Sequence, residues 1–437
     1  MREALFESLL EYTRDGEWGK GEPGSDLVKM GVIRGTDFDK VRYGDFSTVP
    51  SRYIPKAIAE RKVLRANDIL IETAGGTVNQ PTDRTVFLSE KGLEKYPDPR
   101  ICASFSRFLR IGSDEVSAPY LFWYWQYLWR ERLIYDYHIQ HTGVARFQYT
   151  LFASEQIIPL PSLPEQREIA ALLGALDDKI EVNRKASATL EAMARALYRS
   201  WIVDFDPVWA KLEGRPPAHM SPKTATLFPN SFDDDGLPLG WKIGNLSDVA
   251  TNPRNGIKPE QIHPETPYIG LEHMPRRSIT LADWGSAADV GSQKSEMRAG
   301  DFLFGKLRPY FHKVGVSPVD GICSTDIIVV RPKSPEWSGF VLTVISSDEF
   351  VEHTNAGSSG TRMPRTNWTD MGAYAVTLPP PVVAAAFEAI TSPWRERIVS
   401  GIHEAKTLAT LRNSLLPQLM SGELRVGAAH ELIEEVA

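Results

Sequence analysis

Cysteine and long apolar runs are what this sequence has least of. Its 437 residues include two cysteines, Cys102 and Cys323, too few for a disulfide framework or a four-cysteine zinc site. No run of about 18 apolar residues occurs, so no membrane span is expected, and the N-terminal segment lacks the apolar core of a signal peptide. These absences predict a cytoplasmic protein in a reducing compartment.

An excess of positive charge is also missing. The formal net charge is −7, which argues against a uniformly basic nucleic-acid binder. Positive and negative charges nearly cancel within residues 1–155 and within residues 241–378. Any nucleic-acid surface must therefore be local. A hydrophobic content of 42% and a charged content of 24% are ordinary for a globular chain, and this length allows two to four domains.

A heptad pattern marks the stretch from Ser162 to Trp201. Alternating steps of four and three residues from Ile169 give ten positions, of which eight are apolar. This period of about 3.5 residues is typical of a coiled-coil seam, and at ~1.5 Å per residue the seam would be about 48 Å long. A single helix of that length must pack against another element. The seam positions are Ile169, Leu173, Leu176, Ile180, Asn183, Ser187, Leu190, Ala194, Leu197 and Trp201.

The same pattern recurs 218 residues further along the chain, where seven of ten positions are apolar. The approach to each helix also matches, with Leu160-Pro161 before the first and Leu378-Pro379 before the second. Two unrelated amphipathic helices that share a heptad by chance are the alternative. The second set is Phe387, Thr391, Trp394, Ile398, Gly401, Ala405, Leu408, Arg412, Leu415 and Leu419.

Internal repeats extend the match beyond the helices, which favours a duplicated unit. Each helix is also preceded by a glycine, basic residues and an aromatic residue: Gly143, Arg146 and Phe147 in the first half, and Gly360, Arg362, Arg365 and Trp368 in the second. Three pairs of segments match in the same order: Val32–Gly35 with Tyr268–Leu271, Leu64–Ile71 with Met297–Phe304, and Ile101–Ser104 with Ile322–Thr325.

These matches predict an α+β chain with two mixed α/β globular units separated by two long helices that pair as a coiled coil. We expect a first unit over 1–160, a long helix over 161–203, a surface linker over 204–240, a second unit over 241–378, a long helix over 379–422 and a tail over 423–437.

No catalytic or metal-binding constellation is found. Gly300–Leu307 resembles a phosphate-binding loop but has Leu307 where a Ser or Thr must ligate magnesium. The aromatic run from Tyr120 to Trp129 could stack on bases, but a buried helix with the aromatic side chains in the core is the favoured interpretation.

Taken together, these segments resemble the specificity subunit of type I restriction-modification systems. The resemblance is carried by Ile158–Ala170 (IPLPSLPEQREIA), by Ser200–Val208 (SWIVDFDPV) and by Gly305–Tyr310 (GKLRPY). The second helix departs from the pattern, because Pro379–Ala384 lacks the Glu-Gln pair.

The resemblance implies that each unit is a target-recognition domain that reads one half of a bipartite, asymmetric site in double-stranded DNA. The two helices would form an antiparallel coiled coil that fixes the spacing and binds methyltransferase subunits, and the complex would recruit restriction subunits. The chain itself would perform no chemistry and hold no cofactor, since S-adenosylmethionine, ATP and Mg²⁺ would lie on the partner subunits.

Two groups of residues are hypothesised to make the contacts. The basic residues of Gly-containing segments, expected to face DNA, are Lys306, Arg308, Lys313, Arg362 and Arg365 in the second unit and, more weakly, Arg84, Arg146 and Gln148 in the first. Glu165, Gln166 and Arg167 are expected to dock methyltransferase subunits. A DNA methyltransferase or nuclease with a diverged site, and a coiled-coil adaptor without DNA binding, remain the alternatives.

Overall fold

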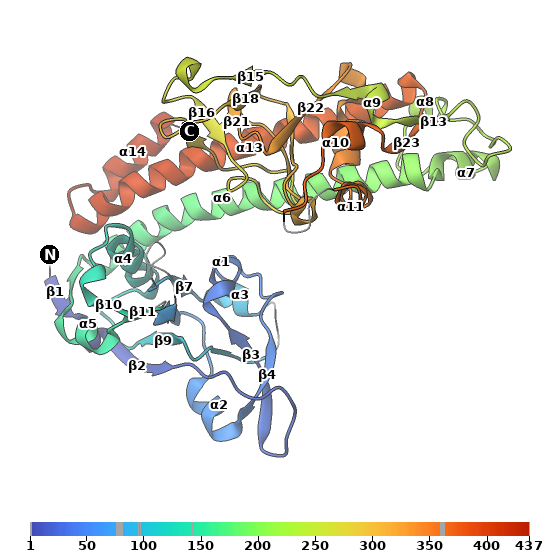
Figure 1. The fold of residues 1–437 in the computed structure, drawn as a ribbon. Helices are drawn as coiled ribbons and strands as arrows, with labels where there is room; N and C mark the ends of the chain where they lie inside the picture. Colours follow the sequence, from blue (N-terminus) through green and yellow to red (C-terminus); the bar gives the residue numbers. More distant parts are fainter. Residues whose placement is uncertain are drawn as a thin grey trace. The chain divides into compact units, whose positions relative to one another are not determined.

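The computed structural model describes residues 2–75, 82–94, 96, 98–141, 144–358 and 363–436. The chain forms two compact units, the first made of Met1–Glu181 with Leu408–Ala437 and the second of Val182–Thr407. Two long helices, α6 (Leu163–Tyr198) and α13 (Pro381–Ser421), contribute residues to both units (Figure 1). No helix among the described residues is long and apolar enough to cross a membrane.

The first unit is built on a four-stranded antiparallel sheet in the order β2-β9-β5-β7. A three-stranded sheet β4-β3-β8, a small sheet β10-β11-β6 and the pair β1-β12 complete its strands. The strands are β1 (Arg2–Leu5), β2 (Leu10–Asp15), β3 (Leu27–Ile33), β4 (Ser51–Pro55), β5 (Ile69–Glu72), β6 (Ala74–Gly75), β7 (Thr85–Phe87), β8 (Arg100–Cys102), β9 (Ser106–Ile111), β10 (His138–His141), β11 (Val144–Phe147) and β12 (Ile157–Leu160).

Helix α4 (Ala118–Arg130) carries the aromatic run, and its burial confirms the core interpretation. Ser117 caps the helix start by accepting a hydrogen bond from the Tyr120 amide. Trp125 is fully buried against the rings of Phe6 and Phe152. The shorter helices of the unit are α1 (Phe38–Val41), α2 (Lys56–Lys62), α3 (Glu90–Glu94), α5 (Tyr149–Glu155) and α14 (Val426–Val436).

The second unit repeats the architecture with a four-stranded sheet β14-β22-β19-β20, a five-stranded sheet β15-β18-β21-β16-β17 and the pair β13-β23. Its strands are β13 (Lys242–Asn245), β14 (Ala250–Thr251), β15 (Gly256–Ile257), β16 (Pro267–Ile269), β17 (Gly285–Ser286), β18 (Lys294–Met297), β19 (Phe302–Gly305), β20 (Val314–Val316), β21 (Gly321–Cys323), β22 (Ile327–Pro332) and β23 (Ala375–Leu378). Its helices besides α6 and α13 are α7 (Asp206–Leu212), α8 (Pro222–Ala225), α9 (Leu246–Val249), α10 (Ser338–Ile345), α11 (Asp348–Ala356) and α12 (Trp368–Gly372).

The two cysteines lie at equivalent positions of the repeat, as the sequence match predicts. Strand β3 runs parallel to β8 with Ile33 opposite Cys102, and β16 runs parallel to β21 with Ile269 opposite Cys323. Both thiols are buried, and burial raises the pKa of each to about 12.

A buried ion pair occupies the same sheet position in both units. Asp68, just before β5, accepts hydrogen bonds from Arg110 on β9 at 2.9 and 2.7 Å. Asp301, just before β19, accepts from Arg331 on β22 at 2.6 and 2.5 Å. The residue before each aspartate has a positive φ, +68° at Asn67 and +87° at Gly300, so both turns use a left-handed residue. The duplication therefore includes backbone conformation and buried charge.

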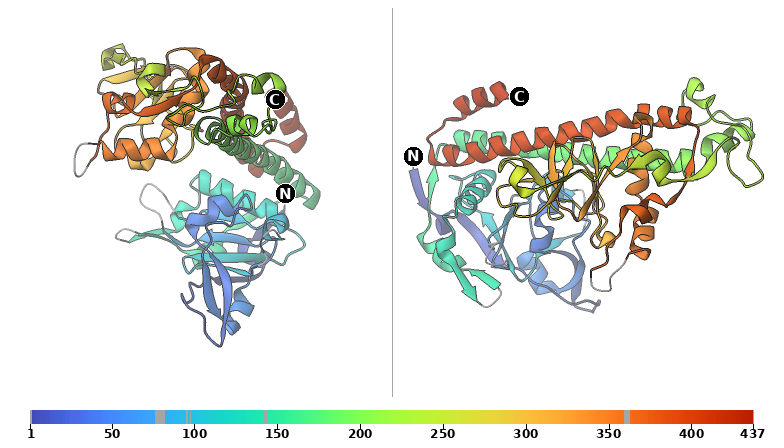
Figure 2. Two further views of the ribbon diagram at one scale, coloured as in Figure 1. Left: turned by 90° about the vertical axis from the view of Figure 1, so that its right-hand side faces the viewer. Right: turned by 45° about the horizontal axis from the view of Figure 1, so that its top comes forward.

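The long helices pair in opposite directions (Figure 2). In the first unit the early seam residues Ile169, Leu173 and Leu176 share one core with the late α13 residues Leu415 and Leu419. In the second unit the late α6 residues Leu190 and Leu197 share a core with the early α13 residues Phe387 and Ile398. Every seam position of both helices is buried or half-buried. The antiparallel coiled coil that the family resemblance implies is confirmed.

The segment 204–240 is part of the second unit and does not simply run over its surface. Val208 on α7 and Phe228 after α8 are buried in that unit's core, and the Phe228 ring contacts Trp201 at a centroid distance of 5.1 Å. Segment 423–437 likewise carries a helix, α14, whose Val426 and Ala429 are buried in the first unit. Both segments therefore contribute to the cores that position the helices.

Candidate nucleic-acid interface

Each unit has an open groove beside one edge of its four-stranded sheet. The segment that leads into a short helix, α5 in the first unit and α12 in the second, lies along that edge. The first groove has a volume of about 750 Å³ and the second of about 310 Å³. The first is lined by residues that include Asp15, Thr73, Phe105, Arg107, Arg146, Gln148 and Tyr149. The second is lined by residues that include Arg254, Gln293, Lys294, Lys306, Thr366, Asn367 and Trp368.

Backbone hydrogen bonds show that the two grooves occupy equivalent places in the repeat. The Phe147 amide donates to the Thr73 carbonyl at 3.0 Å, and the Thr366 amide donates to the Lys306 carbonyl at 3.1 Å. One residue earlier, Arg146 lies opposite Ala74. In the second unit Arg365 pairs in the same way with Leu307. Arg146 and Arg365 therefore hold the same position, as do Gln148 and Asn367.

This register corrects one detail of the sequence match. Phe147 corresponds to Thr366, whereas matching aromatic to aromatic placed it opposite Trp368. The residue equivalent to Trp368 is Tyr149, and each of these two begins the helix that follows, α5 or α12. The backbone ladder, which the sequence does not show, decides the register.

The first groove combines exposed aromatic and hydrogen-bonding side chains. Phe105 is 66% exposed, and an exposed ring in a basic groove can stack on a base. Arg146 is exposed and Gln148 half-buried, and these side-chain types can bind guanine and adenine edges respectively. Arg107 forms an ion pair with Asp15 at 2.8 Å and lies over the Tyr149 ring at 4.3 Å. The groove thus offers both stacking and base-edge contacts.

The second groove is more polar. Lys306 and Thr366 come from its paired segments, and Asn367 uses its side chain to cap α12 by accepting from the Asp370 amide at 3.0 Å. Arg365 is half-exposed and forms an ion pair with Asp326 at 3.3 Å. Arg308 is held beside this ladder because its amide donates to the Pro364 carbonyl at 2.8 Å. The backbone pairing thus places the segment of Lys306 and Arg308 beside that of Arg365, and of these three side chains Lys306 lines the groove.

Two other predicted residues are already engaged within the protein. Arg84 makes two hydrogen bonds of 3.0 Å to Glu72. The Lys313 ammonium contacts the Leu271 carbonyl, and burial lowers the pKa of Lys313. The registers of β5-β7 and β19-β20 make Arg84 and Lys313 equivalent residues of the repeat. Their contact with DNA stays a prediction, and Arg362 lies outside the described residues.

Some candidate residues were missed by sequence reasoning. Phe105, Arg254 and Asn367 line the grooves but belong to no recognisable motif. Extending the sequence repeat by strand register would have identified Asn367, because Asn367 in the second unit is equivalent to Gln148 in the first. Phe105 and Arg254 had no comparable signal, since exposure at a groove is a property of the folded chain.

The start of α6 carries the residues expected to dock a partner. Gln166 is fully buried, and its side chain bonds the Ser117 amide at 2.9 Å and the Glu115 carbonyl at 2.9 Å. Glu165 forms an ion pair with Arg425, and Arg167 is exposed. Gln166 thus secures the helix start internally, and any docking surface at this end consists of Glu165 and Arg167. A cavity of about 540 Å³ lies beside it, lined by residues that include Arg2, Asp114, Ser162, Glu165 and Arg425.

Comparison with known proteins agrees with this architecture. No family model matches the chain. The type I restriction enzyme MjaIX specificity subunit of Methanocaldococcus jannaschii is 24% identical over 339 residues, which cover 72% of this chain and 71% of that protein. The HindI specificity subunit of Haemophilus influenzae is 23% identical over 314 residues, covering 61% and 68%. The chain is a homologue of type I specificity subunits.

The fold agrees over nearly the whole length of a solved specificity subunit. The crystal structure of the type I restriction-modification S subunit from M. genitalium matches with a TM-score of 0.57 at 14% sequence identity, covering 96% of this chain and 95% of that chain. The shared fold includes both halves of the repeat. The α+β architecture predicted from the sequence is therefore that of a specificity subunit.

Proposed function

We propose that this chain is the DNA sequence-specificity subunit of a type I restriction-modification complex. Residues 1–160, the first recognition domain, would read one half of a bipartite asymmetric site, and residues 241–378, the second recognition domain, the other half. The long helices would fix the distance between the half-sites and bind methyltransferase subunits, with restriction subunits joining the complex. The chain would contribute specificity, and its partners would supply S-adenosylmethionine, ATP and Mg²⁺.

The observation that carries the proposal is the pair of equivalent grooves with different linings. An equivalent position in each domain implies the same kind of ligand, because the same strands and the same helix start would face it. Different side chains at those positions imply different preferences: Arg107 in the first domain is replaced by Ile328 in the second, and Tyr149 by Trp368. Two recognition domains with the same fold and different groove residues are suited to a DNA site whose two halves have different sequences.

The helices suit the spacing role. They are 36 and 41 residues long, so at ~1.5 Å per residue each measures roughly 54–62 Å. That length exceeds one turn of duplex, about 34–36 Å. Two domains carried on such a support can address the same face of DNA in successive grooves.

The docking proposal concerns the helix start. Two side chains there lie outside the seam: Arg167 is exposed, and Glu165 is 25% exposed and paired with Arg425. If they bind the methyltransferase, Glu165→Ala with Arg167→Ala should lower the methyltransferase retained on affinity-purified chain. Glu168→Ala is the matched control, because Glu168 is the next residue of the helix and is also exposed. Full stoichiometry in the double variant would contradict this docking site.

The decisive experiment maps methylated adenines in DNA from cells that carry this chain with its methyltransferase subunit. The proposal predicts one bipartite sequence with an unread spacer, and loss of methylation when either recognition domain is deleted. Methylation or cleavage by the purified chain alone would instead favour an enzyme with a diverged site. Absence of DNA binding by the complex would favour an adaptor.

A further inference from the structure

Asp177 and Glu191 are two of the nearly buried carboxylates on helix α6 that lie outside the seam. Asp177 is 5% exposed and Glu191 is 6% exposed. They are 14 residues apart (191 − 177), which is two heptads, so they occupy the same flanking position of the helix. A buried carboxylate is destabilising unless partners compensate for its lost hydration, so the partners of these two indicate what they do.

Asp177 binds the first recognition domain. One of its oxygens accepts a hydrogen bond from Arg42 Nε at 2.7 Å, and the other contacts Arg412 of α13. Arg42 directly follows α1, and its guanidinium lies over the rings of Phe122 and Trp123 at 5.1 and 5.3 Å. One carboxylate therefore joins both spacer helices to a rigid part of the domain.

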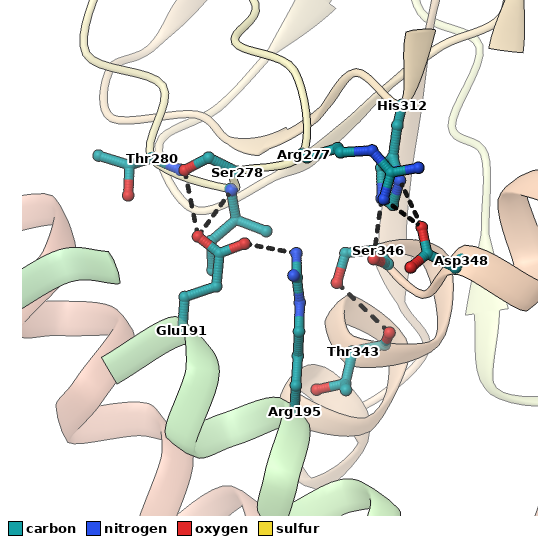
Figure 3. Close-up of polar contacts among 10 residues, drawn as sticks. Glu191, Arg195, Arg277, Ser278, Thr280, His312, Thr343, Ser346 and Asp348 are labelled. Carbon is teal, nitrogen blue, oxygen red and sulfur yellow. Dashed lines mark hydrogen bonds and ion pairs between the residues drawn. The ribbon is translucent and has the colours of Figure 1, made fainter. Parts of the chain in front are cut away.

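Glu191 does the same for the second recognition domain (Figure 3). Its Oε2 accepts from the Ser278 hydroxyl at 3.1 Å and from the Ile279 amide at 3.1 Å. Its Oε1 accepts from Arg195, one turn along the same helix, at 2.5 Å. The Ile279 side chain is buried in the domain core, so the loop that Glu191 binds cannot move independently of the domain.

The loop bound by Glu191 is also fixed on its other side. Arg277 forms an ion pair with Asp348 at 2.8 Å, and Asp348 lies 3.2 Å from His312 (Figure 3). His312 Nε2 lies 3.0 Å from the Ser346 carbonyl. A displacement at Glu191 would therefore be transmitted to the start of α11 and to His312, which lies just before β20.

We infer that Asp177 and Glu191 are positioning residues that fix the angle of each recognition domain on the spacer helices, and that they thereby set how strictly one spacer length is selected. This inference rests on the proposed function. Each base pair added to the spacer moves a half-site by about 3.4 Å and rotates it by about 34°. A domain held by a buried charged contact cannot follow that movement, whereas a domain released from it can.

A first experiment measures the domain angle without DNA or partners. In the full chain, spin labels at Ser47→Cys and Ala171→Cys report the first domain against α6, and labels at Ala288→Cys and Ala188→Cys report the second. All four sites are exposed, and the buried native thiols, with pKa values raised to about 12, should stay unlabelled. Arg42→Met should broaden only the first distance distribution, and Glu191→Ala only the second.

The variants are chosen to keep the fold. Arg42→Met leaves Asp177 its contact with Arg412, and Glu191→Gln, which retains an acceptor oxygen, should broaden less than Glu191→Ala. The matched controls are Lys40→Met, which removes a positive charge from an exposed position of α1, and Glu168→Gln, which removes a negative charge from an exposed position of α6. Distributions as narrow in Arg42→Met and Glu191→Ala as in the parent chain would overturn the inference.

A second experiment measures spacer selection by the methyltransferase complex on duplexes that differ only in spacer length. Removing a charged hydrogen bond in either variant should reduce discrimination against a spacer one base pair too long or short by roughly tenfold, with the half-sites unchanged. Broadened distances with an unaltered spacer profile would overturn the link to spacing. A parent complex that selects no bipartite site would overturn the proposed function as well.

Discussion

The first and second units share the aspartate–arginine pair at one sheet position but line their equivalent grooves with unlike side chains. Asp68 with Arg110 and Asp301 with Arg331 repeat down to the residue of positive φ before each aspartate. Arg107 and Ile328 line the two grooves at equivalent positions, and one side chain is charged whereas the other is apolar. The ion pair and the turn before it are therefore repeated in both units, whereas the groove linings differ, and under the proposed function the grooves would give each unit its own base preference.

The largest effect is expected from lengthening the two long helices while leaving the recognition domains unchanged. This change separates the spacing function of the helices from base recognition by the domains. Inserting seven residues at matched places in α6 and α13 keeps the seam in register and adds about 10.5 Å at ~1.5 Å per residue. That corresponds to about three base pairs at ~3.4 Å each. Methylation mapping should find the original half-sites separated by a longer spacer, or by somewhat less if the coil does not follow the DNA twist.

The insertion has two informative contrary outcomes. An assembled, active variant that keeps the old spacer would show that the helices do not measure distance. Altered half-site bases with the old spacer would place sequence reading on the helices. Inserting seven residues in only one helix is the control, since it breaks the pairing and should abolish activity at any spacer.

Removing the aspartate of the ion pair in each unit tests whether the pair stabilises both units in the same way. Asp68→Ala and Asp301→Ala each leave a buried or part-buried arginine without its carboxylate, which should lower the free energy of unfolding by about 3–5 kcal/mol. The loss should be somewhat smaller for Asp301, because Arg331 is 29% exposed whereas Arg110 is 12% exposed. Hydrogen exchange resolved along the chain would show which unit opens.

Surface aspartates serve as controls for the ion-pair variants. Asp114→Ala in the first unit and Asp289→Ala in the second remove the same charge from exposed positions and should change stability by less than about 0.5 kcal/mol. If either ion-pair variant unfolds no more easily than its control, that ion pair does not stabilise its unit.

The seam and the repeat could be read from the sequence because both are periodic. Apolar residues at 3.5-residue spacing, and the order Ile-Cys in both halves, depend only on local pattern. The contact of Arg42 with Asp177 could not, because it joins residues 135 positions apart and leaves no pattern in either segment. The burial of Gln166 and Phe228 was missed for the same reason, since a polar or linker residue becomes core only when a distant segment covers it.

Groove variants test whether specificity differs between the copies. Arg146→Ala with Gln148→Ala should relax base preference in the half-site of the first domain, at about 1–3 kcal/mol for each base that is no longer bound by its side chain. Lys306→Ala with Arg308→Ala and Arg365→Ala should act on the other half-site, and removal of a phosphate-binding cation would also flatten the salt dependence of binding. Binding to duplexes randomised in one half-site at a time provides the measurement.

The groove prediction has a built-in control, because each set of substitutions should leave the other half-site unchanged. Lys242→Ala, an exposed lysine away from both grooves, should affect neither. Unchanged affinity, base preference and salt slope in both sets would remove the grooves from the reading surface. A change in both half-sites from one set would mean that the domains are not independent readers.

The smallest expected effect concerns one repeat position that holds an aspartate beside a histidine in the first unit and a histidine beside an aspartate in the second. Asp83 in the first unit contacts His138, whereas His312, the residue at the same position of the second, lies 3.2 Å from Asp348. Both have a positive φ, +73° and +50°. Burial raises the pKa of Asp83 to about 6 and lowers the pKa of His312.

These opposite pKa shifts predict that the stabilities of the two units depend on pH in opposite directions. Folded Asp83 holds a proton that the unfolded chain has lost, so its contribution is lost as pH rises through about 6, by about 1–3 kcal/mol. Folded His312 resists the proton that unfolded histidine binds below about 6.5, so its contribution is lost as pH falls below that value. Hydrogen exchange between about pH 4.5 and 7.5 should show the first unit opening more easily at high pH and the second at low pH. Asp83→Asn and His312→Asn, which suit a left-handed backbone, should each flatten the dependence of one unit. Parallel pH profiles in the two units would show that the exchanged residues do not control their stability.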